Sequence, residues 1–342
     1  MGSRTVVGAR RARTAVAPHS PVATKRLLTL LHISDTHIAE GDCPTGGGRI
    51  DPSLLPRWRR GRAWHGVLSH STPAMLALAE FAARLRETEG AITIHSGDLT
   101  SWGAPRQFAA AHAILPEVLR DPKALDLSIP GNHDHWPGTG GVFGRSSSAL
   151  QQHFSGLPWI RRIPLRADRL LTIAAIDSDA DVAPWSNARF WGRGFFLSQL
   201  AELDVLLPRR APGEVRVLLM HHSPFIDRYH LGIARRSRAA LDLFLPRHGF
   251  RVILCGHVHR ARGHLQICAH GQVLEARCGS TTQRDCVPAD GTHVRHGIPQ
   301  NTLIVHRLEE DDEGMLSWRS ELYRHGLKGF EPAGKLAELP MV

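Results

Sequence analysis

The sequence lacks a long apolar run, and this absence excludes a membrane-spanning helix. No stretch approaches the roughly 18 to 20 consecutive apolar residues that such a helix needs. The basic N-terminus, residues 1–26, contains no acidic residue, but the apolar core of a secretory signal does not follow it. Val6 also stands where a myristoylation signal requires Ser or Thr. We therefore expect residues 1–26 to form a disordered, solvated basic tail.

Cysteine is scarce, and its spacing is uninformative. The five cysteines are odd in number and none are spaced as Cys-x-x-Cys, so neither a disulfide framework nor a structural zinc site is predicted. Reduced thiols, and with them a cytoplasmic location, are the expectation. The signature of intrinsic disorder is missing too, because 42% of the residues are hydrophobic and 22% are charged.

Acidic residues are outnumbered, with 32 Asp and Glu against 42 Lys and Arg, and the formal net charge is +10. Such basicity is typical of proteins that bind nucleic acids or other anions. The arginines are scattered, however, and no RNP or helix-turn-helix motif accompanies them. The charge is therefore compatible with any phosphate-bearing substrate, and nucleic acid is possible but not favoured. The 22 histidines are the second unusual feature and indicate metal binding.

Short apolar segments alternate with helical patterns from residue 27 onward, which predicts an α/β fold. The clearest helix is predicted over residues 73–87, because Ser71 or Thr72 can cap it and Gly90 follows it. We read residues 27–322 as one domain and residues 323–342 as a C-terminal extension. Further helices are expected over 107–119, 198–207 and 237–245, and strands over 27–33, 91–95, 125–129, 170–176, 215–220, 250–254, 273–276, 301–307 and 315–322. The acidic residues 309–313 are expected to form a solvated hairpin turn.

Five of the predicted strands are followed, within a few residues, by side chains that can bind metal ions. In chain order the segments are Asp35-Thr36-His37, Gly97-Asp98, Gly131-Asn132-His133-Asp134, His221-His222 and Gly256-His257-Val258-His259. Because ligands of open α/β sheets bind beyond the carboxyl ends of the strands, we expect all five segments to meet in one crevice. Three of the segments contain a glycine just before a polar residue, Gly97, Gly131 and Gly256, which indicates a tight turn or a close backbone approach.

The residue types in these segments indicate which metals they suit. Asp35 and His37 are two residues apart, as are His257 and His259, so in an extended chain each pair points the same way and can share one ion. Imidazole, carboxylate and amide oxygen together suit manganese, iron, zinc, nickel or cobalt better than calcium or magnesium. The donor groups suffice for two ions with Asp98 between them.

Taken in order, the five segments resemble the motifs of the calcineurin-like metallophosphoesterase superfamily, which run Asp-x-His, Gly-Asp, Gly-Asn-His-Asp/Glu, His and Gly-His-x-His. Every motif is present without substitution, and the resemblance covers residues 27–322. It implies a four-layer α/β/β/α sandwich of two mixed sheets with flanking helices. It also implies two divalent transition-metal ions, manganese, iron or zinc. One ion would be held by Asp35, His37 and His259, the other by Asn132, His221 and His257, and Asp98 would bridge both.

The fourth motif leaves two candidates, because His221 and His222 are adjacent. The family usually uses the residue directly after the strand, which favours His221 and leaves His222 as a supporting or substrate-side group. His133 is expected to lie beside the ions without binding them and to protonate the leaving alkoxide, while Asp134 or a backbone carbonyl fixes its tautomer. The attacking group would be a hydroxide that bridges the two ions.

Within the superfamily, the residues in and around the motifs of Asp35, Asp98 and His221 are most similar to those of bacterial class III cyclic-nucleotide and glycerophosphodiester phosphodiesterases. We therefore expect hydrolysis of a small-molecule phosphodiester. A phosphomonoesterase, a nucleotide-lipid pyrophosphatase or a nuclease of the same superfamily is the alternative. A non-catalytic metal-binding scaffold is disfavoured because no ligand is missing.

A long segment without a secondary-structure pattern, residues 39–70, leaves directly from the first motif. Loops of this length are usually functional or disordered. We hypothesise a lid in which Arg59 binds phosphate and Trp64 stacks on a base or covers an apolar group. A solvated basic loop is the alternative.

Overall fold

The computed structural model describes residues 24–39, 70–138, 142–166, 168–226, 231–268, 271–283 and 300–341. The strands in these residues form two mixed sheets. In spatial order the first sheet contains β11 (Gly329–Met341), β10 (Leu316–Gly326), β9 (Thr302–Asp311), β1 (Thr24–Ile33) and β2 (Ile92–His95). The second contains β3 (Trp159–Arg166), β4 (Arg169–Ala175), β5 (Glu214–Leu219), β6 (Phe250–Cys255), β8 (Gly271–Arg277) and β7 (Arg262–Cys268). Parallel pairing joins β1 to β2 and the run β4, β5, β6 and β8, whereas the other neighbours are antiparallel.

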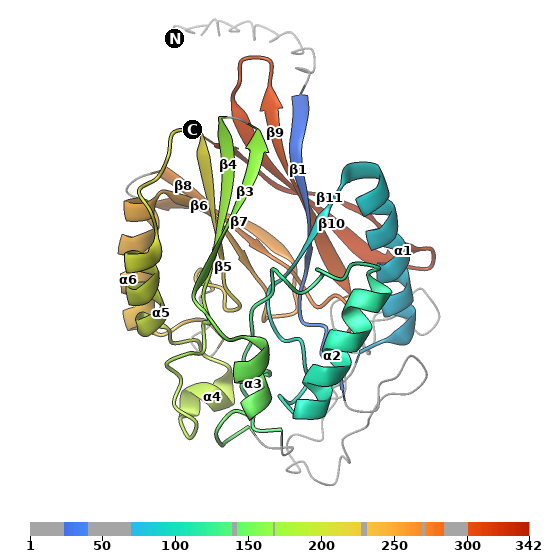
Figure 1. Ribbon diagram of the computed structural model, residues 1–342, viewed down its shortest axis with the longest axis vertical. Helices are drawn as coiled ribbons and strands as arrows, with labels where there is room; N and C mark the ends of the chain where they lie inside the picture. Colours follow the sequence, from blue (N-terminus) through green and yellow to red (C-terminus); the bar gives the residue numbers. More distant parts are fainter. Residues whose placement is uncertain are drawn as a thin grey trace, which may run out of the picture.

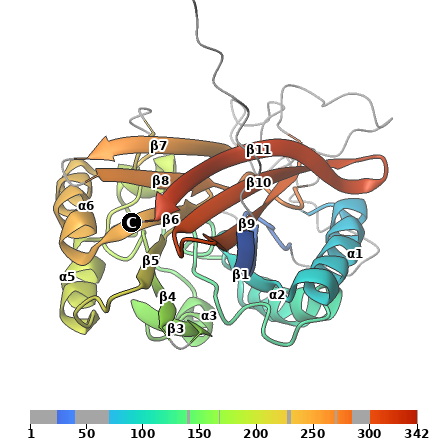
Figure 2. The ribbon, with the colours of Figure 1, turned by 90° about the horizontal axis from the view of Figure 1, so that it is seen from above.

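Helices cover the outer face of each sheet. The first sheet carries α1 (Thr72–Glu89) and α2 (Pro105–Val118), and the second carries α5 (Leu197–Leu206) and α6 (Arg235–His248) (Figure 1). Seen from above, the order is helices, sheet, sheet, helices (Figure 2). The short helices α3 (Ser148–His153) and α4 (Asn187–Trp191) lie at the lower end of the molecule in Figure 1. The predicted four-layer sandwich is confirmed.

The apolar side chains alternate between two cores along each central strand. In β6, Val252 and Leu254 belong to the core between the sheets, whereas Ile253 and Cys255 face α5 and α6. Strands that are buried on both faces read as continuous apolar runs, which is why β1, β5 and β6 are recognisable in the sequence. No helix in the described part of the chain is long and apolar enough to cross a membrane.

The predicted helix over residues 73–87 forms for the expected reasons. Ser71 caps it, with its hydroxyl accepting the Ala74 N–H at 3.3 Å, and Gly90 ends it in the left-handed conformation with φ 64°. Its buried face includes Leu78 and Phe81, which pack on the first sheet.

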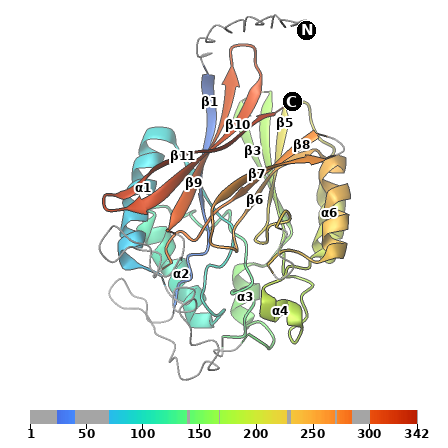
Figure 3. The same ribbon diagram turned by 180° about the vertical axis from the view of Figure 1, so that it is seen from behind.

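Some expected elements differ in the structure. The predicted strand over 125–129 is reduced to a single bridge between His95 and Ser128, because only the end of β2 lies beside it. The expected domain boundary at residue 322 falls inside β10, and β11 continues the sheet from the segment read as an extension. Lys25, at the end of the expected tail, already pairs with β9. Figure 3 shows β11 from behind at the edge of the first sheet, where it also contacts β7 and β8.

The acidic stretch 309–313 is only partly a hairpin turn. The strand β9 extends to Asp311, and the Glu310 side chain is buried and accepts hydrogen bonds from Arg166 and Arg169. The turn itself begins at Asp311, whose carboxylate accepts the Met315 N–H at 2.8 Å. The expectation of a solvated segment is therefore wrong for Glu310, because its partners come from a strand pair of the other sheet.

Candidate metal centre

The segments that follow β1, β2, β5 and β6 meet at the end of the sandwich where α3 and α4 lie (Figure 1). Backbone hydrogen bonds join them: Asp35 N–H donates to Gly97 O at 3.0 Å, and Gly256 N–H donates to His221 O at 3.0 Å. The expected convergence of strand ends is thus present in the structure. It brings aspartates and histidines from both sheets to one buried place.

The first group of candidate ligands contains Asp35, His37, Asp98 and His259, whose ligand atoms all lie within 4.8 Å of one another. The His259 Nε2 atom lies 3.1 Å from His37 Nε2 and 3.1 Å from Asp35 Oδ1. Two ligands that bind one ion at about 2.1 Å and at right angles would lie about 3 Å apart. The spacing of these three atoms therefore fits a shared cation.

The second group contains Asp98, His221 and His257, and it shares Asp98 with the first. His221 Nε2 lies 3.3 Å from Asp98 Oδ2. Because one carboxylate belongs to both groups, the two sites adjoin, as expected for a bridging Asp98. The His and Asp groups are consistent with a dinuclear metal site.

The hydrogen bonds of these side chains indicate whether they suit metal ions. Asp35 Oδ1, Asp98 Oδ2, His221 Nε2 and His257 Nε2 are buried and have no hydrogen-bond partner among the described residues. The second carboxylate oxygen of each aspartate does have a partner: Asp35 Oδ2 accepts a hydrogen bond from the Ser34 hydroxyl, and Asp98 Oδ1 accepts the backbone N–H of His133 at 2.9 Å. Buried polar atoms without partners are costly and rare. Here four such atoms lie in the same two ligand groups, and the second oxygen of each aspartate is hydrogen-bonded to the protein. This arrangement is typical of metal ligands, which the protein orients through the atoms that do not bind the ion.

The charges also suit ligands. Burial opposes ionisation of Asp35, but the neighbouring His259 and His221 hold the pKa of Asp35 at about 2. Burial lowers the pKa of His37 to about 3, so this imidazole is neutral. For His221, burial is outweighed by the Asp98 carboxylate, which raises the pKa of His221 to about 10. An ionised carboxylate and a neutral imidazole are the forms that bind metals, and at His221 a proton competes with an ion for the same nitrogen.

Most of the candidate ligands have a left-handed backbone conformation, which is strained for residues other than glycine. Six non-glycine residues in the described part of the chain have positive φ, and five are candidate ligands: Asp35, His37, Asp98, His257 and His259. The left-handed conformation costs such residues roughly 1–2 kcal/mol each. Strain of this kind persists where the surrounding structure enforces it and is concentrated at functional sites.

Two of the motif glycines are required by space. A Cβ atom at Gly131 would lie 2.2 Å from Asp98 Oδ1, and one at Gly256 would lie 2.0 Å from Ser34 Oγ and 2.6 Å from Asp35 Oδ2. Any other residue would push a carboxylate of the centre aside. The close backbone approach expected from the sequence is present at both positions.

The structure distinguishes the two adjacent histidines. The His221 ring has Nδ1 on the Ser96 carbonyl at 2.7 Å, so its Nε2 is free to face Asp98. Both nitrogens of His222 are engaged elsewhere, Nδ1 with Ser178 Oγ at 2.8 Å and Nε2 with Gly192 O at 3.0 Å. The geometry therefore favours His221 as the ligand and His222 as a support.

Asn132 lies beside the second group, in contact with His257. Its Oδ1 accepts a hydrogen bond from His257 Nδ1 at 2.9 Å, which leaves His257 Nε2 toward the centre. An amide oxygen has two lone pairs, so this contact is compatible with binding an ion as well. The ligand role of Asn132 stays a prediction.

Of the two groups expected to fix the His133 tautomer, Asp134 or a backbone carbonyl, the structure shows the backbone carbonyl. His133 Nδ1 lies 2.9 Å from the Ser101 carbonyl, so a backbone oxygen fixes its tautomer. The Asp134 carboxylate instead accepts hydrogen bonds from the backbone of Leu99, Thr100 and Gly131 and from the Thr100 hydroxyl. Burial and the neighbouring Asp98 raise the pKa of Asp134 to about 6. Asp134 is therefore a structural anchor that ties the third motif to the second, because its oxygens point at backbone donors and not at the His133 ring.

A second polar cluster lies beside the centre, and its members Asp177, Asp179 and Arg189 were not predicted from the sequence. His135 Nε2 lies 2.9 Å from Asp177 Oδ2, and the Arg189 guanidinium donates to the His135 carbonyl. Asp179 is buried 3.5 Å from His222 Nδ1, and burial raises the pKa of Asp179 to about 7. Asp177 and Asp179 directly follow β4, so the strand-end position that revealed the other motifs also marks these two. Arg59 and Trp64 of the hypothesised lid lie outside the described residues.

Comparison with known proteins identifies the family. A family model for calcineurin-like phosphoesterases matches residues 28–261, more than half of the 342-residue chain. The chain is a calcineurin-like phosphoesterase. Membership confirms the superfamily predicted from the motifs, whereas the subclass and the ligand set stay predictions. A comparison with curated proteins found no match.

One solved structure shows a related fold, and the similarity to a second is weaker. This calcineurin-like phosphoesterase is similar to GAP50, the anchor in the inner membrane complex of Plasmodium, with a TM-score of 0.53 and 12% identity over 92% of this chain and 89% of that chain. A putative 5′-nucleotidase from Staphylococcus aureus, in complex with alpha-ketoglutarate, has a TM-score of 0.43 and 14% identity over 92% of this chain and 54% of that chain. The similarity to GAP50 supports the fold and carries no conclusion on substrate.

Proposed function

We propose that this calcineurin-like phosphoesterase hydrolyses a small-molecule phosphodiester, such as a cyclic nucleotide or a glycerophosphodiester, with two transition-metal ions bound. The position of Asp98 carries the proposal. Asp98 belongs to both ligand groups, its Oδ2 lies 3.3 Å from His221 Nε2, and its Oδ1 accepts the backbone N–H of His133. The His133 ring itself lies 4.7 Å, centroid to centroid, from the ring of the candidate ligand His37. An imidazole that can transfer a proton therefore lies beside two adjoining candidate cation sites, and phosphoester hydrolysis uses such an arrangement.

The residues divide into those that hold ions and one that moves a proton. The ligands would be Asp35, His37 and His259 for one ion, Asn132, His221 and His257 for the other, and Asp98 for both. Bound there, the ions would activate water and neutralise charge on the phosphoryl oxygens. His133 keeps its Nδ1 hydrogen on the Ser101 carbonyl, so proton exchange occurs at Nε2. Burial lowers the pKa of His133, which makes its protonated form a stronger acid toward a leaving alkoxide.

One observation supports a diester as the substrate: the residues of the motifs resemble those of the cyclic-nucleotide and glycerophosphodiester enzymes. The alkoxide leaving group of such a substrate needs a proton, which His133 would supply, as it would for an alkyl monoester. The scattered arginines favour a small molecule over a nucleic acid as partner.

The test is a comparison of substrates in the presence of Mn²⁺, after treatment with EDTA, and after Mn²⁺ is restored. The panel contains bis-p-nitrophenyl phosphate, cAMP, glycerophosphocholine, p-nitrophenyl phosphate and single-stranded DNA. We expect kcat/KM for at least one small diester to exceed that for the monoester tenfold or more, with activity lost in EDTA and recovered with Mn²⁺. A tenfold preference for the monoester would replace the proposal with a phosphomonoesterase, and a preference for DNA would replace it with a nuclease. No turnover of any substrate by metal-loaded protein would refute an enzymatic function.

A matched pair of variants separates the site from general effects. Asp98→Asn removes the shared carboxylate charge and is expected to abolish turnover. Asp126→Asn makes the same change at an exposed position outside the centre and is expected to leave turnover unchanged. Equal activity of the two variants would contradict the assignment of Asp98.

A further inference from the structure

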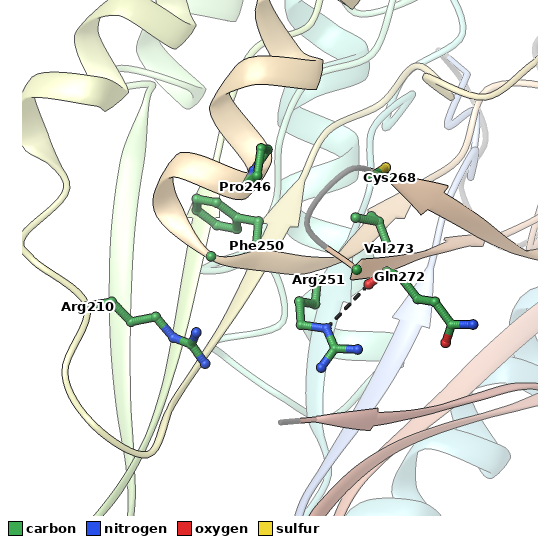
Figure 4. A pocket seen from close by; sticks show the side chains of 9 residues that line it. Arg210, Pro246, Phe250, Arg251, Cys268, Gln272 and Val273 are labelled. Carbon is green, nitrogen blue, oxygen red and sulfur yellow. Dashed lines mark hydrogen bonds between the residues drawn. The ribbon is translucent and has the colours of Figure 1, made fainter.

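A cavity of about 370 Å³ lies at the opposite end of β6 from the metal centre. Its residues come from the end of α6, the start of β6 and the β7–β8 pair (Figure 4). Phe250 and Arg251 open β6, whereas His257 follows its other end, so six or seven residues of extended chain, about 20 Å, separate the two places. The volume is within the range of small-molecule pockets, roughly 300–1,000 Å³.

The floor of this cavity is apolar. Phe250 and Val273 are buried beneath it, and Pro246 and Cys268 contribute further apolar surface. An occupant with a flat or aliphatic body would therefore displace water from apolar surface, which is favourable.

Two arginines, Arg210 and Arg251, line the same cavity. Arg210 Nε donates to the Glu214 carbonyl at 3.1 Å, and Arg251 Nε donates to the Gln272 carbonyl at 3.3 Å. Neither guanidinium forms an ion pair with a carboxylate in the described part of the chain. Figure 4 shows both guanidinium groups on the same side of the cavity. Burial and, second to it, the neighbouring Arg210 charge lower the pKa of Arg251.

The hydrogen bonds of Arg210 and Arg251 leave part of each guanidinium group able to bind a ligand. Each is fixed to a backbone carbonyl through Nε, so its two terminal NH₂ groups remain available as donors. Gly249 adds to this, because a Cβ at its position would lie 2.9 Å from Arg210 Cδ, and the missing side chain lets Arg210 lie across the end of α6. Guanidinium groups present planar pairs of donors that match the oxygens of phosphate and carboxylate groups.

We propose that this cavity binds a small organic anion, whose phosphate or carboxylate group lies between Arg210 and Arg251 and whose apolar body rests on Phe250 and Val273. The site is separate from the metal centre and does not depend on the proposed phosphodiesterase activity. An anion there would neutralise two like charges that have no ion-pair partner among the described residues.

The test uses phenylphosphonate, which has no hydrolysable ester, with inorganic phosphate and benzoate as companions. Cys268 lines the cavity, is a free thiol and is partly exposed, so its rate of alkylation by the neutral reagent iodoacetamide reports occupancy at this place. Peptide mass spectrometry separates Cys268 from the other cysteines. We expect phenylphosphonate to slow Cys268 alkylation at least fivefold at saturation and to bind more tightly than inorganic phosphate, because only the former reaches the apolar floor. Tighter binding of benzoate would assign a carboxylate ligand, and tighter binding of phenylphosphonate a phosphate ligand.

Matched variants locate the binding. Arg210→Gln and Arg251→Gln are each expected to weaken phenylphosphonate binding about tenfold or more, since each removes charge-assisted hydrogen bonds. Arg209→Gln removes the same charge from an exposed neighbour outside the cavity and is expected to leave binding within twofold of the unaltered protein. Calorimetric binding without protection of Cys268 would place the anion at the metal centre and overturn the proposal. Protection that persists in both the Arg210 and Arg251 variants would overturn it as well, and the Cys268 measurement on the unaltered chain stands even if a variant fails to fold. Substrate turnover is measured separately, so failure of this proposal leaves the proposed function untouched.

Discussion

Gly131→Ala tests whether the backbone of the third motif sets the position of the shared carboxylate. The added Cβ would lie 2.2 Å from Asp98 Oδ1, 2.5 Å from Asp98 N and 2.7 Å from His221 Cε1, where ordinary contact begins at 3.4 Å. The shortfall between 2.2 and 3.4 Å means that the carboxylate oxygen must move by about 1.2 Å. Because φ at Gly131 is not in the left-handed region, the effect comes from space alone.

The size of the expected effect follows from that displacement. A misplacement of about 1 Å in a catalytic site costs on the order of 10²-fold in rate. Overpacking of this kind also costs roughly 1–3 kcal/mol of stability. We expect Gly131→Ala to fold, to lose metal on desalting and to hydrolyse bis-p-nitrophenyl phosphate on the order of 100-fold more slowly.

The assay combines metal analysis after desalting with diester turnover and a thermal melt. Gly326→Ala is the matched control, since φ at Gly326 is also outside the left-handed region and the nearest atom to its new Cβ is the flexible Glu331 Oε2 at 3.1 Å. This control is expected to keep metal content and rate. A folded Gly131→Ala protein with unchanged metal content and rate would refute the reasoning.

Three further predictions concern single side chains. His133→Ala is expected to keep its metal but to lose 10²-fold or more in the hydrolysis of alkyl phosphodiesters, with a smaller loss on p-nitrophenyl esters, whose leaving group needs no proton; equal losses on both in rate assays would exclude a proton donor. Asp134→Ala strands four donors and is expected to lower the unfolding free energy by about 3 kcal/mol or more in urea titrations, against a loss below about 0.5 kcal/mol for Asp126→Ala. Hydrogen bonds from Arg307 lower the pKa of Glu89, so the stability that this carboxylate contributes is present above its unfolded pKa and is lost as pH falls through the folded value. The stability difference between the unaltered protein and Glu89→Gln is therefore expected to be largest near pH 7 and to shrink below pH 4, and a difference independent of pH would contradict this.

Much of the candidate site was predictable because its residues follow strands that are buried on both faces. The apolar runs before Asp35, Asp98, His221 and His257 are visible in the sequence, and the topology then brings the ends of parallel strands together. Asp177 and Asp179 occupy the same kind of position after β4, but no family motif drew attention to them.

The strand β11 was missed for a physical reason. It contains Pro332, Pro340 and two glycines, Gly329 and Gly334, a composition that is typical of a loop. It tolerates them because it is an edge strand that pairs only with β10 within the sheet. The outcome at Asp134 could not be foreseen for another reason: sequence order says which residues are neighbours, but not whether a carboxylate turns toward an imidazole or toward backbone N–H groups.

The central claim is that two ions share Asp98. The most direct measurement is the Mn²⁺ content of the unaltered chain by elemental analysis, together with the electron paramagnetic resonance spectrum of the same sample. Two ions per chain with the spectrum of a magnetically coupled pair are expected, and Asp98→Asn is expected to lose the coupling and at least one ion. One ion per chain in the unaltered protein, or a coupled pair that survives Asp98→Asn, would contradict the account.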